Sequence, residues 1–339
     1  MPLARPVVGS RIDSAIAHPP SLVHIVSHGP HCLDGVTAAV AVARSYAGVE
    51  VQAHFANNPE INETLLAVPP PPAGTTQDLW ITDISWTRPE TDAHLRALAA
   101  AGTRITWIDH HRTAIERLRR GAIDVPLSSM VVEDTYAASR LVFEHIRRTL
   151  DPRAPWAERF LALERLVTLA DDNDRWIHAH EGSRELALTV GAMHGTEAYE
   201  DLLGIDAAVT YTPRMREAYA RIAAELAATH ALAERTRTER RVGAVLVVAA
   251  WCAGFPSEIG DAWGKRNPNA VFALYDTKSR GVSFRRSPDC LVDLSKVAET
   301  FGGGGHAAAA GCQIEGMGDR DSAALADLVA QAVARVASA

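Results

Sequence analysis

The stretch Ile105-Thr106-Trp107-Ile108-Asp109-His110-His111 determines how the rest of the chain is interpreted. Its first four residues are β-branched or aromatic, which is typical of a buried strand. An acid and two histidines follow directly, and open α/β sheets collect their ligands at the carboxyl ends of strands. Carboxylate and neutral imidazole are ligands that suit manganese, iron or zinc. The stretch therefore predicts a parallel strand that ends at a metal site.

The sequence around this stretch alternates between strand-like and helix-like runs. Strands are predicted at 22–27, 49–55, 79–82 and 105–108, and helices at 35–46, 89–101, 134–150 and 157–169. This order predicts a mostly parallel, doubly wound sheet with helices on both faces. After a helical run at 214–240, strand-like runs resume at 242–250, 270–275 and 281–285. We therefore expect a two-lobed α/β protein with a boundary between residues 205 and 240.

Composition narrows the class of protein. The 339 residues are 47% hydrophobic and 22% charged, as in ordinary globular proteins. No run reaches the roughly 18 apolar residues of a membrane span, so no membrane partner is expected. The net charge of −7 argues against binding long duplex nucleic acid, which needs a basic surface. Four scattered cysteines without disulfide or zinc-ribbon spacing predict a reduced, cytoplasmic protein.

Four segments rich in acids and histidines carry the predicted chemistry. They are His28–Gly35, Asp83, Asp109–His111 and Asp171–Asp174. Three of them follow predicted strands, so their side chains should meet at one edge of the sheet. Carboxylates gathered without lysine or arginine repel each other, and divalent cations relieve that repulsion. The cluster therefore predicts two metal ions, about 3.5–4 Å apart, with a bridging water activated as hydroxide.

A glycine-rich turn at Gly302–His306 indicates a second kind of site. Glycines let backbone amides approach a ligand, and successive amides in such a turn form an anion-binding nest. Upstream, Arg285 and Arg286 end a predicted strand and suit bidentate contact with a phosphate. The alternative is a flexible loop beside two solvated arginines. Trp86 and Trp176 could stack on a nucleobase, but we expect both to pack in the core.

Together these motifs resemble the DHH phosphoesterase superfamily, in the subgroup with a DHHA1 substrate-binding domain. Asp109-His110-His111 matches the signature, and Gly302–His306 with Ala309-Ala310-Gly311 matches the glycine motif. Ser283-Phe284-Arg285 matches the element that precedes it. The resemblance implies a DHH catalytic domain at 21–205, a helical linker at 206–240 and a DHHA1 domain at 241–339, after an N-terminal arm at 1–20. It also implies two divalent ions, with Mn²⁺ as the first expectation.

The resemblance assigns roles to individual residues. The implied metal ligands are His28, Asp34, Asp83 as the bridge, His110 and an acid from 171–174. His111 would contact the phosphate, and Asp109 would support the site. The residues implied to hold the substrate from the DHHA1 domain are Arg285, Gly303, Gly304 and His306.

Two positions depart from the family pattern or leave it ambiguous. Cys32 stands where the family has a ligand aspartate, and a thiolate would favour softer ions such as Zn²⁺, Co²⁺ or Fe²⁺. Alternatively, His31 ligates the first ion, or the first site is weak or empty. In the fourth segment we favour Asp172 as the ligand, with Asp174 as the second choice.

The expected function is that of a metal-dependent phosphohydrolase. It would cleave phosphoester bonds of short oligonucleotides or small nucleotides through a metal-bridging hydroxide. The alternatives are a cyclic-dinucleotide phosphodiesterase, or a nucleotide-binding sensor whose catalysis is weakened by Cys32. Exposed sheet edges could support a homodimer.

Overall fold

The computed structural model describes residues 20–337, so the predicted arm at 1–20 lies almost entirely outside the described residues. The chain divides into two compact units, unit 1 (Met1–Ile222) and unit 2 (Ala223–Ala339). The division falls within one helix, α10 (Pro213–Thr236). No helix among residues 20–337 is long and apolar enough to span a bilayer.

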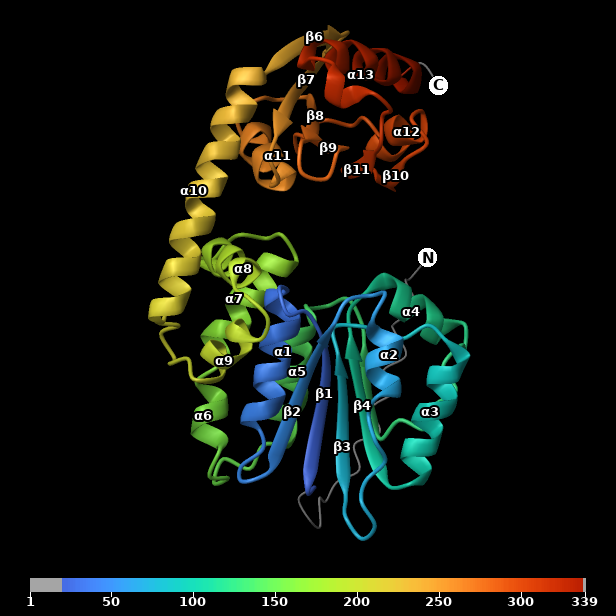
Figure 1. The fold of residues 1–339 in the computed structure, drawn as a ribbon, viewed down its shortest axis with the longest axis vertical. Helices are drawn as coiled ribbons and strands as arrows, with labels where there is room; N and C mark the ends of the chain where they lie inside the picture. Colours follow the sequence, from blue (N-terminus) through green and yellow to red (C-terminus); the bar gives the residue numbers. More distant parts are fainter. Residues whose placement is uncertain (1–19, 338–339) are drawn as a thin grey trace, which may run out of the picture. The chain divides into compact units, whose positions relative to one another are not determined.

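Unit 1 contains a five-stranded parallel sheet in the order β2-β1-β3-β4-β5 (Figure 1). The strands are β1 (Leu22–His28), β2 (Glu50–Ala56), β3 (Gln77–Thr82), β4 (Thr103–Asp109) and β5 (Ser129–Val132). The central strand β3 is buried along its whole length, as expected for a parallel strand with helices on both faces. All carboxyl ends share one edge, which confirms the predicted mostly parallel sheet.

Helices cover both faces of this sheet (Figure 1). On one face lie α1 (Leu33–Arg44) and α5 (Ala138–Thr149), and the helices packed around α1 are α6 (Ala157–Leu161), α7 (Glu164–Asp174), α8 (Ser183–Ala192) and α9 (Glu197–Leu203). On the other face lie α2 (Ile61–Leu66), α3 (Pro89–Ala100) and α4 (Arg112–Arg119). Every residue of α1 is buried, which explains why its sequence is apolar on all sides except for Asp34, Thr37 and Arg44.

Unit 2 contains a six-stranded mixed sheet in the order β10-β11-β9-β8-β7-β6. The strands are β6 (Thr238–Val242), β7 (Val245–Cys252), β8 (Ala270–Asp276), β9 (Gly281–Arg286), β10 (Gly304–His306) and β11 (Ala309–Cys312). One face packs against α12 (Leu294–Glu299) and α13 (Ser322–Ala337), and the other against α11 (Pro256–Gly264). A second, smaller α/β unit was predicted, and the two-sheet architecture is confirmed.

One predicted helix was too long. The helical run predicted at 214–240 ends at Thr236, and residues 238–242 form the edge strand β6. Strand β6 pairs antiparallel with β7, from Thr238 opposite Ala249 to Val242 opposite Val245. Its arginines and glutamate are typical of the exposed face of a helix, but pairing with β7 overrides this local helix propensity.

The buried histidine of β1 makes stability depend on pH. His24 is 2% exposed, neither ring nitrogen has a hydrogen-bond partner, and the ring stacks on His54. Burial, and then the nearby His54, lower the pKa of His24, while Glu50 opposes them. Below the unfolded-state pKa of about 6.5 the unfolded chain takes up the proton first, so stability falls until pH reaches the lowered folded-state pKa.

We therefore expect the free energy of unfolding to fall as pH drops from 7.5 toward 5. In His24→Leu this fall should be smaller, by up to about 1.4 kcal/mol for each unit by which folding lowers the pKa of His24. Urea unfolding at several pH values, in chelator to remove metals, measures the difference between the two proteins. Parallel pH profiles for wild type and variant would contradict it.

Candidate metal centre

Three neighbouring strand ends bring acids and histidines together in unit 1. His28 is the last residue of β1, Asp83 follows β3, and Asp109 ends β4 just before His110 and His111. The backbone of Asp83 has φ of +60°, a left-handed conformation that aspartate tolerates better than most residues. Its N–H donates to the carbonyl of Ile108 at 3.0 Å, which ties this turn to β4.

A glycine in the first turn of α1 lets that helix approach the same edge. A Cβ added at Gly35 would lie 2.1 Å from the carbonyl oxygen of His28 and 3.1 Å from Oδ2 of Asp83. Ser27 Oγ donates to the Gly35 carbonyl at 2.7 Å and fixes the contact. Only glycine permits this approach, which places Cys32 and Asp34 beside the strand ends.

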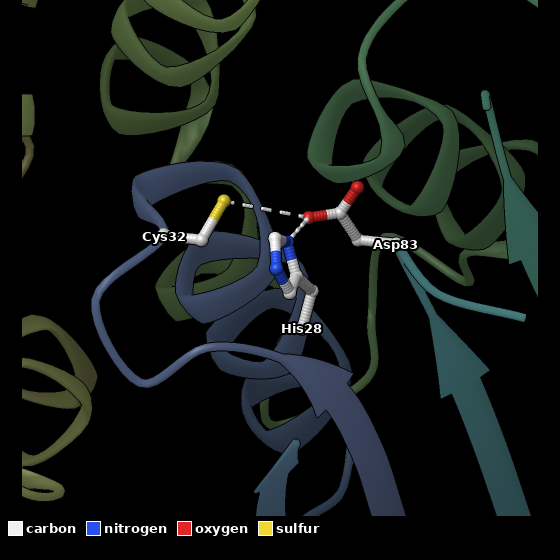
Figure 2. A group of neighbouring side chains, drawn as sticks. All are labelled: His28, Cys32 and Asp83. Atoms are coloured by element: carbon white, nitrogen blue, oxygen red, sulfur yellow. Dashed lines mark hydrogen bonds and ion pairs between the residues drawn. The ribbon is translucent and has the colours of Figure 1, made fainter. Parts of the chain in front are cut away.

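The carboxylate of Asp83 lies between two groups of potential ligands. Its Oδ2 is 3.4 Å from Nδ1 of His28 and 3.5 Å from Sγ of Cys32. Figure 2 shows both side chains beside this carboxylate. Its Oδ1 is 3.2 Å from Nε2 of His110. We call His28, Cys32 and Asp83 the first half of the centre.

The second half consists of Asp34, Asp83, His110 and Asp174. Nε2 of His110 lies 3.8 Å from Oδ2 of Asp34 and 3.5 Å from Oδ2 of Asp174. Asp34 also accepts hydrogen bonds from the backbone N–H groups of Ala138 and Ser139, at 2.8 and 2.9 Å, at the start of α5. Its carboxylate is therefore held by a helix N-terminus as well as by the cluster.

The electrostatics of the cluster indicate a place for cations. Burial, and then the neighbouring Asp83, raise the pKa of Asp34 well above its ordinary value. Burial would lower the pKa of His110, but the surrounding Asp83, Asp34 and Asp174 raise it to about 9. Oδ1 of Asp83 and Nε2 of His110 are buried 3.2 Å apart, and neither makes a well-aligned hydrogen bond. A bound cation would satisfy such atoms, so the residues present fit a metal.

His111 differs from His110 in both contacts and exposure. Asp109 accepts the backbone N–H of His111 at 2.9 Å and lies 2.8 Å from its Nδ1. Ser85 Oγ donates to the other oxygen of Asp109 at 3.1 Å. The hydrogen bond with Asp109 raises the pKa of His111, whose side chain is 47% exposed. Asp109 thus orients a half-exposed imidazole that leaves Nε2 for another partner.

The structure places the two candidate acids of the fourth segment, Asp172 and Asp174, in different surroundings. The carboxylate of Asp172 accepts backbone N–H groups of Ala179 and His180 at 2.9 and 3.3 Å, so it stabilises the loop after α7. Asp174 enters the cluster instead. Residues two apart on a helix project roughly 200° apart, so both acids could not face one site. His31, the alternative to Cys32, is exposed and belongs to none of the candidate metal groups among the described residues.

Two residues near the centre were missed or misjudged in the sequence. Ser85 carries no motif, and its contact with Asp109 appears only in the fold. Trp86 is fully buried as expected, but Trp176, two residues after Asp174, is 44% exposed. Its ring contacts Arg184, whose guanidinium carbon lies 4.4 Å from the ring centroid. An exposed aromatic residue therefore follows the last cluster acid.

In unit 2, the strand register aligns the residues predicted to hold substrate. Arg285 of β9 pairs with Ala309 of β11, which pairs with His306 of β10. Because directly opposed residues in a sheet point to the same face, Arg285 and His306 share a face with a small residue between them. Ser257 Oγ accepts a hydrogen bond from Nη2 of Arg285 at 2.8 Å. The substrate-binding role of this row stays a prediction.

The glycines of the turn have a packing role of their own. A Cβ at Gly303 would lie 2.2 Å from the carbonyl oxygen of Gly311 on β11. At Gly304 an added Cβ would meet nothing within 4 Å. Close packing against β11 therefore explains why residue 303 is glycine. At position 304 a side chain would have room, so packing does not explain that glycine. Binding of an anion by either residue stays a prediction.

Comparison with known proteins agrees with this fold. No protein-family profile matches the chain. A segment of 61 residues, 18% of this chain, is 43% identical to oligoribonuclease NrnB from Bacillus subtilis (strain 168), and the match spans only 15% of that protein. The solved structure of the pGpG-specific phosphodiesterase PggH from Vibrio cholerae aligns over 92% of this chain and 98% of its own, with TM-score 0.55 and 14% identity. The chain therefore shares its fold with this phosphodiesterase over most of its length.

Proposed function

We propose that this chain is a divalent-metal-dependent phosphohydrolase that cleaves phosphoester bonds in short oligonucleotides or small nucleotides. The observation that carries the proposal is the position of Asp83, whose two carboxylate oxygens face two different groups of ligands. A carboxylate shared in this way is suited to bridge a pair of cations. The oxygen and imidazole donors of the second half suit Mn²⁺.

Some residues of the centre would bind metal ions, and others would position the phosphate. When bound, two divalent ions lower the pKa of water and neutralise the oxygens of a phosphate. Asp83 and His110 would hold ions, because Oδ1 of Asp83 and Nε2 of His110 are buried without a well-aligned hydrogen bond. His111, oriented by Asp109, would donate a hydrogen bond to the phosphate from its remaining nitrogen. This half-exposed imidazole stabilises the charge that develops on phosphate oxygens.

The preference for nucleotides rests on a side chain near the centre and on the named relatives. Trp176 exposes an aromatic ring in the turn after Asp174, where it could stack on a nucleobase of a bound substrate. NrnB is named an oligoribonuclease and PggH a pGpG-specific phosphodiesterase, and both substrates are short. The net charge of −7 also favours short substrates over long strands.

A substrate panel with two variants tests this proposal. We expect wild type with Mn²⁺ to hydrolyse dinucleotides and RNAs of two to five nucleotides faster than cyclic dinucleotides, 3′-phosphoadenosine 5′-phosphate or pyrophosphate. Trp176→Ala should raise KM for the nucleotides by about tenfold, since stacking on one base contributes roughly 1–3 kcal/mol. His110→Asn should lower kcat by more than about 100-fold, beyond the 10–100-fold typical of residues that only support a ligand.

The controls separate the parts of the proposal. Trp251→Phe, in unit 2, is the matched tryptophan control and should leave KM unchanged. An unchanged KM in Trp176→Ala would remove the base-stacking role alone. Full activity of His110→Asn would contradict the assignment of the metal site, whereas nucleotide binding without turnover in any divalent metal would contradict the phosphohydrolase itself.

A further inference from the structure

The two halves of the metal centre offer different donor atoms. The first half combines a sulfur, an imidazole and a carboxylate, from Cys32, His28 and Asp83. The second half combines carboxylates with one imidazole, from Asp34, Asp83, Asp174 and His110. Only the shared residue, Asp83, is common to both. Two ions bound here would therefore have different surroundings.

The sulfur of Cys32 is placed toward the other donors. Cys32 occupies the N-cap position of α1, where side chains usually accept a backbone N–H, yet it makes no capping hydrogen bond. Its Sγ instead lies 3.5 Å from Oδ2 of Asp83, and that oxygen is 3.4 Å from Nδ1 of His28 (Figure 2). The three donors come from β1, α1 and the turn after β3, so three separate elements converge on one point.

An independent observation at the shared residue, Asp83, also indicates that the centre binds cations. The side chain of Asp83 is only 2% exposed, and its second oxygen, Oδ1, lies 3.2 Å from Nε2 of His110 without a well-aligned hydrogen bond. Nε2 of His110, which faces that oxygen, has none either. Burying unsatisfied polar atoms is unfavourable unless a ligand completes them. Asp83 thus faces one incomplete site through Oδ1 and the sulfur-containing site through Oδ2.

We propose that the centre binds two different metals, with a thiophilic divalent ion of the Zn²⁺ or Co²⁺ class in the first half and a harder ion such as Mn²⁺ in the second. Thiolate and imidazole donors select zinc and related ions, whereas carboxylate-rich sites accept manganese. This inference rests on the proposed function, because it assumes that the cluster binds metal. It adds the chemical class of the ion in each half.

Cobalt(II) provides a direct probe of the sulfur. Titrating the chelator-treated full-length protein with Co²⁺ should produce a near-ultraviolet thiolate-to-cobalt charge-transfer band as the first half fills. Cys32→Ser and Cys32→Asp should both lack this band. Cys252→Ala, which removes a buried cysteine of unit 2, is the matched control and should keep it.

Metal competition then tests selectivity. After equilibration with Mn²⁺ in large excess over Zn²⁺ and removal of free metal, we expect the wild type to retain both metals in equal amounts, because the excess offsets the generally higher affinity of Zn²⁺. Cys32→Asp should shift the first half toward manganese. Its preference for Zn²⁺ over Mn²⁺ should fall at least about 100-fold, which exceeds the effect of losing a residue that only supports a ligand. Elemental analysis measures both quantities without reference to activity.

The outcomes distinguish this inference from the proposed function. Two bound cobalt ions without a charge-transfer band, or equal Zn²⁺ retention by wild type and Cys32→Asp, would overturn the mixed centre. Hydrolysis of the substrate panel by Mn²⁺-loaded Cys32→Asp would leave the proposed function standing in that case. Wild type that binds no divalent ion would overturn both.

Discussion

Asp83→Asn is expected to lower kcat/KM for short nucleotides by roughly 1,000-fold or more, equivalent to about 4 kcal/mol of transition-state stabilisation. The reason is that Asp83 contributes one carboxylate oxygen to each half of the centre. Asparagine keeps the shape of the side chain and also tolerates the left-handed backbone found at this position. The substitution therefore removes charge and bridging without a new steric demand. Steady-state kinetics together with elemental analysis measures the joint loss of turnover and bound metal.

Asp78 provides the matched control for Asp83. It is a buried acid near the other end of the same strand, where it forms two hydrogen bonds with Arg104. Asp78→Asn should reduce stability while leaving turnover and metal content unchanged. If Asp83→Asn kept two ions and wild-type turnover, the assignment of the centre would be wrong. If both variants lost activity together, the effect of Asp83→Asn would reflect stability and not metal binding.

Arg44→Met is expected to reduce the free energy of unfolding of unit 1 by about 3–5 kcal/mol, since hydrogen bonds to a charged group contribute about 1.5–3 kcal/mol each and are only partly additive. Arg44 is 3% exposed. Its guanidinium donates to the backbone carbonyls of Leu202, Leu203, Ile205 and Arg159. Burial lowers the pKa of Arg44 to about 10, so the group stays charged at neutral pH. Methionine would fill part of the space but leave those carbonyls unsatisfied.

Urea unfolding followed by circular dichroism measures this loss. Arg159→Met is the control, because the exposed Arg159 donates to the same Leu203 carbonyl at 3.2 Å. That surface change should alter stability by no more than about 0.5 kcal/mol. A loss below about 1 kcal/mol in Arg44→Met would show that the carbonyls find water or other donors.

The parallel sheet of unit 1 was predictable because its strands carry a strong local signal. Buried runs such as Ile105–Ile108 are apolar, and the acids that follow them mark the functional edge. Strand β6 was not predictable in the same way, since its two consecutive arginines, Arg240 and Arg241, give no strand signal until the segment pairs with β7. Local propensity determines secondary structure where packing is weak, whereas pairing with β7 determines it for residues 238–242.

For the metal centre, the sequence predicted which types of residue take part but not where each side chain points. The sequence identified His28, Asp34, Asp83 and His110 as candidates, and the fold brings them together. It could not decide between Asp172 and Asp174 without knowing that α7 continues through both residues. The sequence could not identify Ser85, because a single serine two residues after an acid can have many roles. Side-chain direction, not residue type, was the missing information.

The hydrogen bonds at the start of α5 have a consequence for how the centre is loaded. Two backbone amides hold both oxygens of Asp34. The amides belong to a helix that is packed against α1, so this ligand is preorganised by the core of unit 1. An arriving ion therefore orders no loop and loses little binding free energy to conformational entropy. Exchange of the ion would leave behind an intact scaffold, ready to be reloaded.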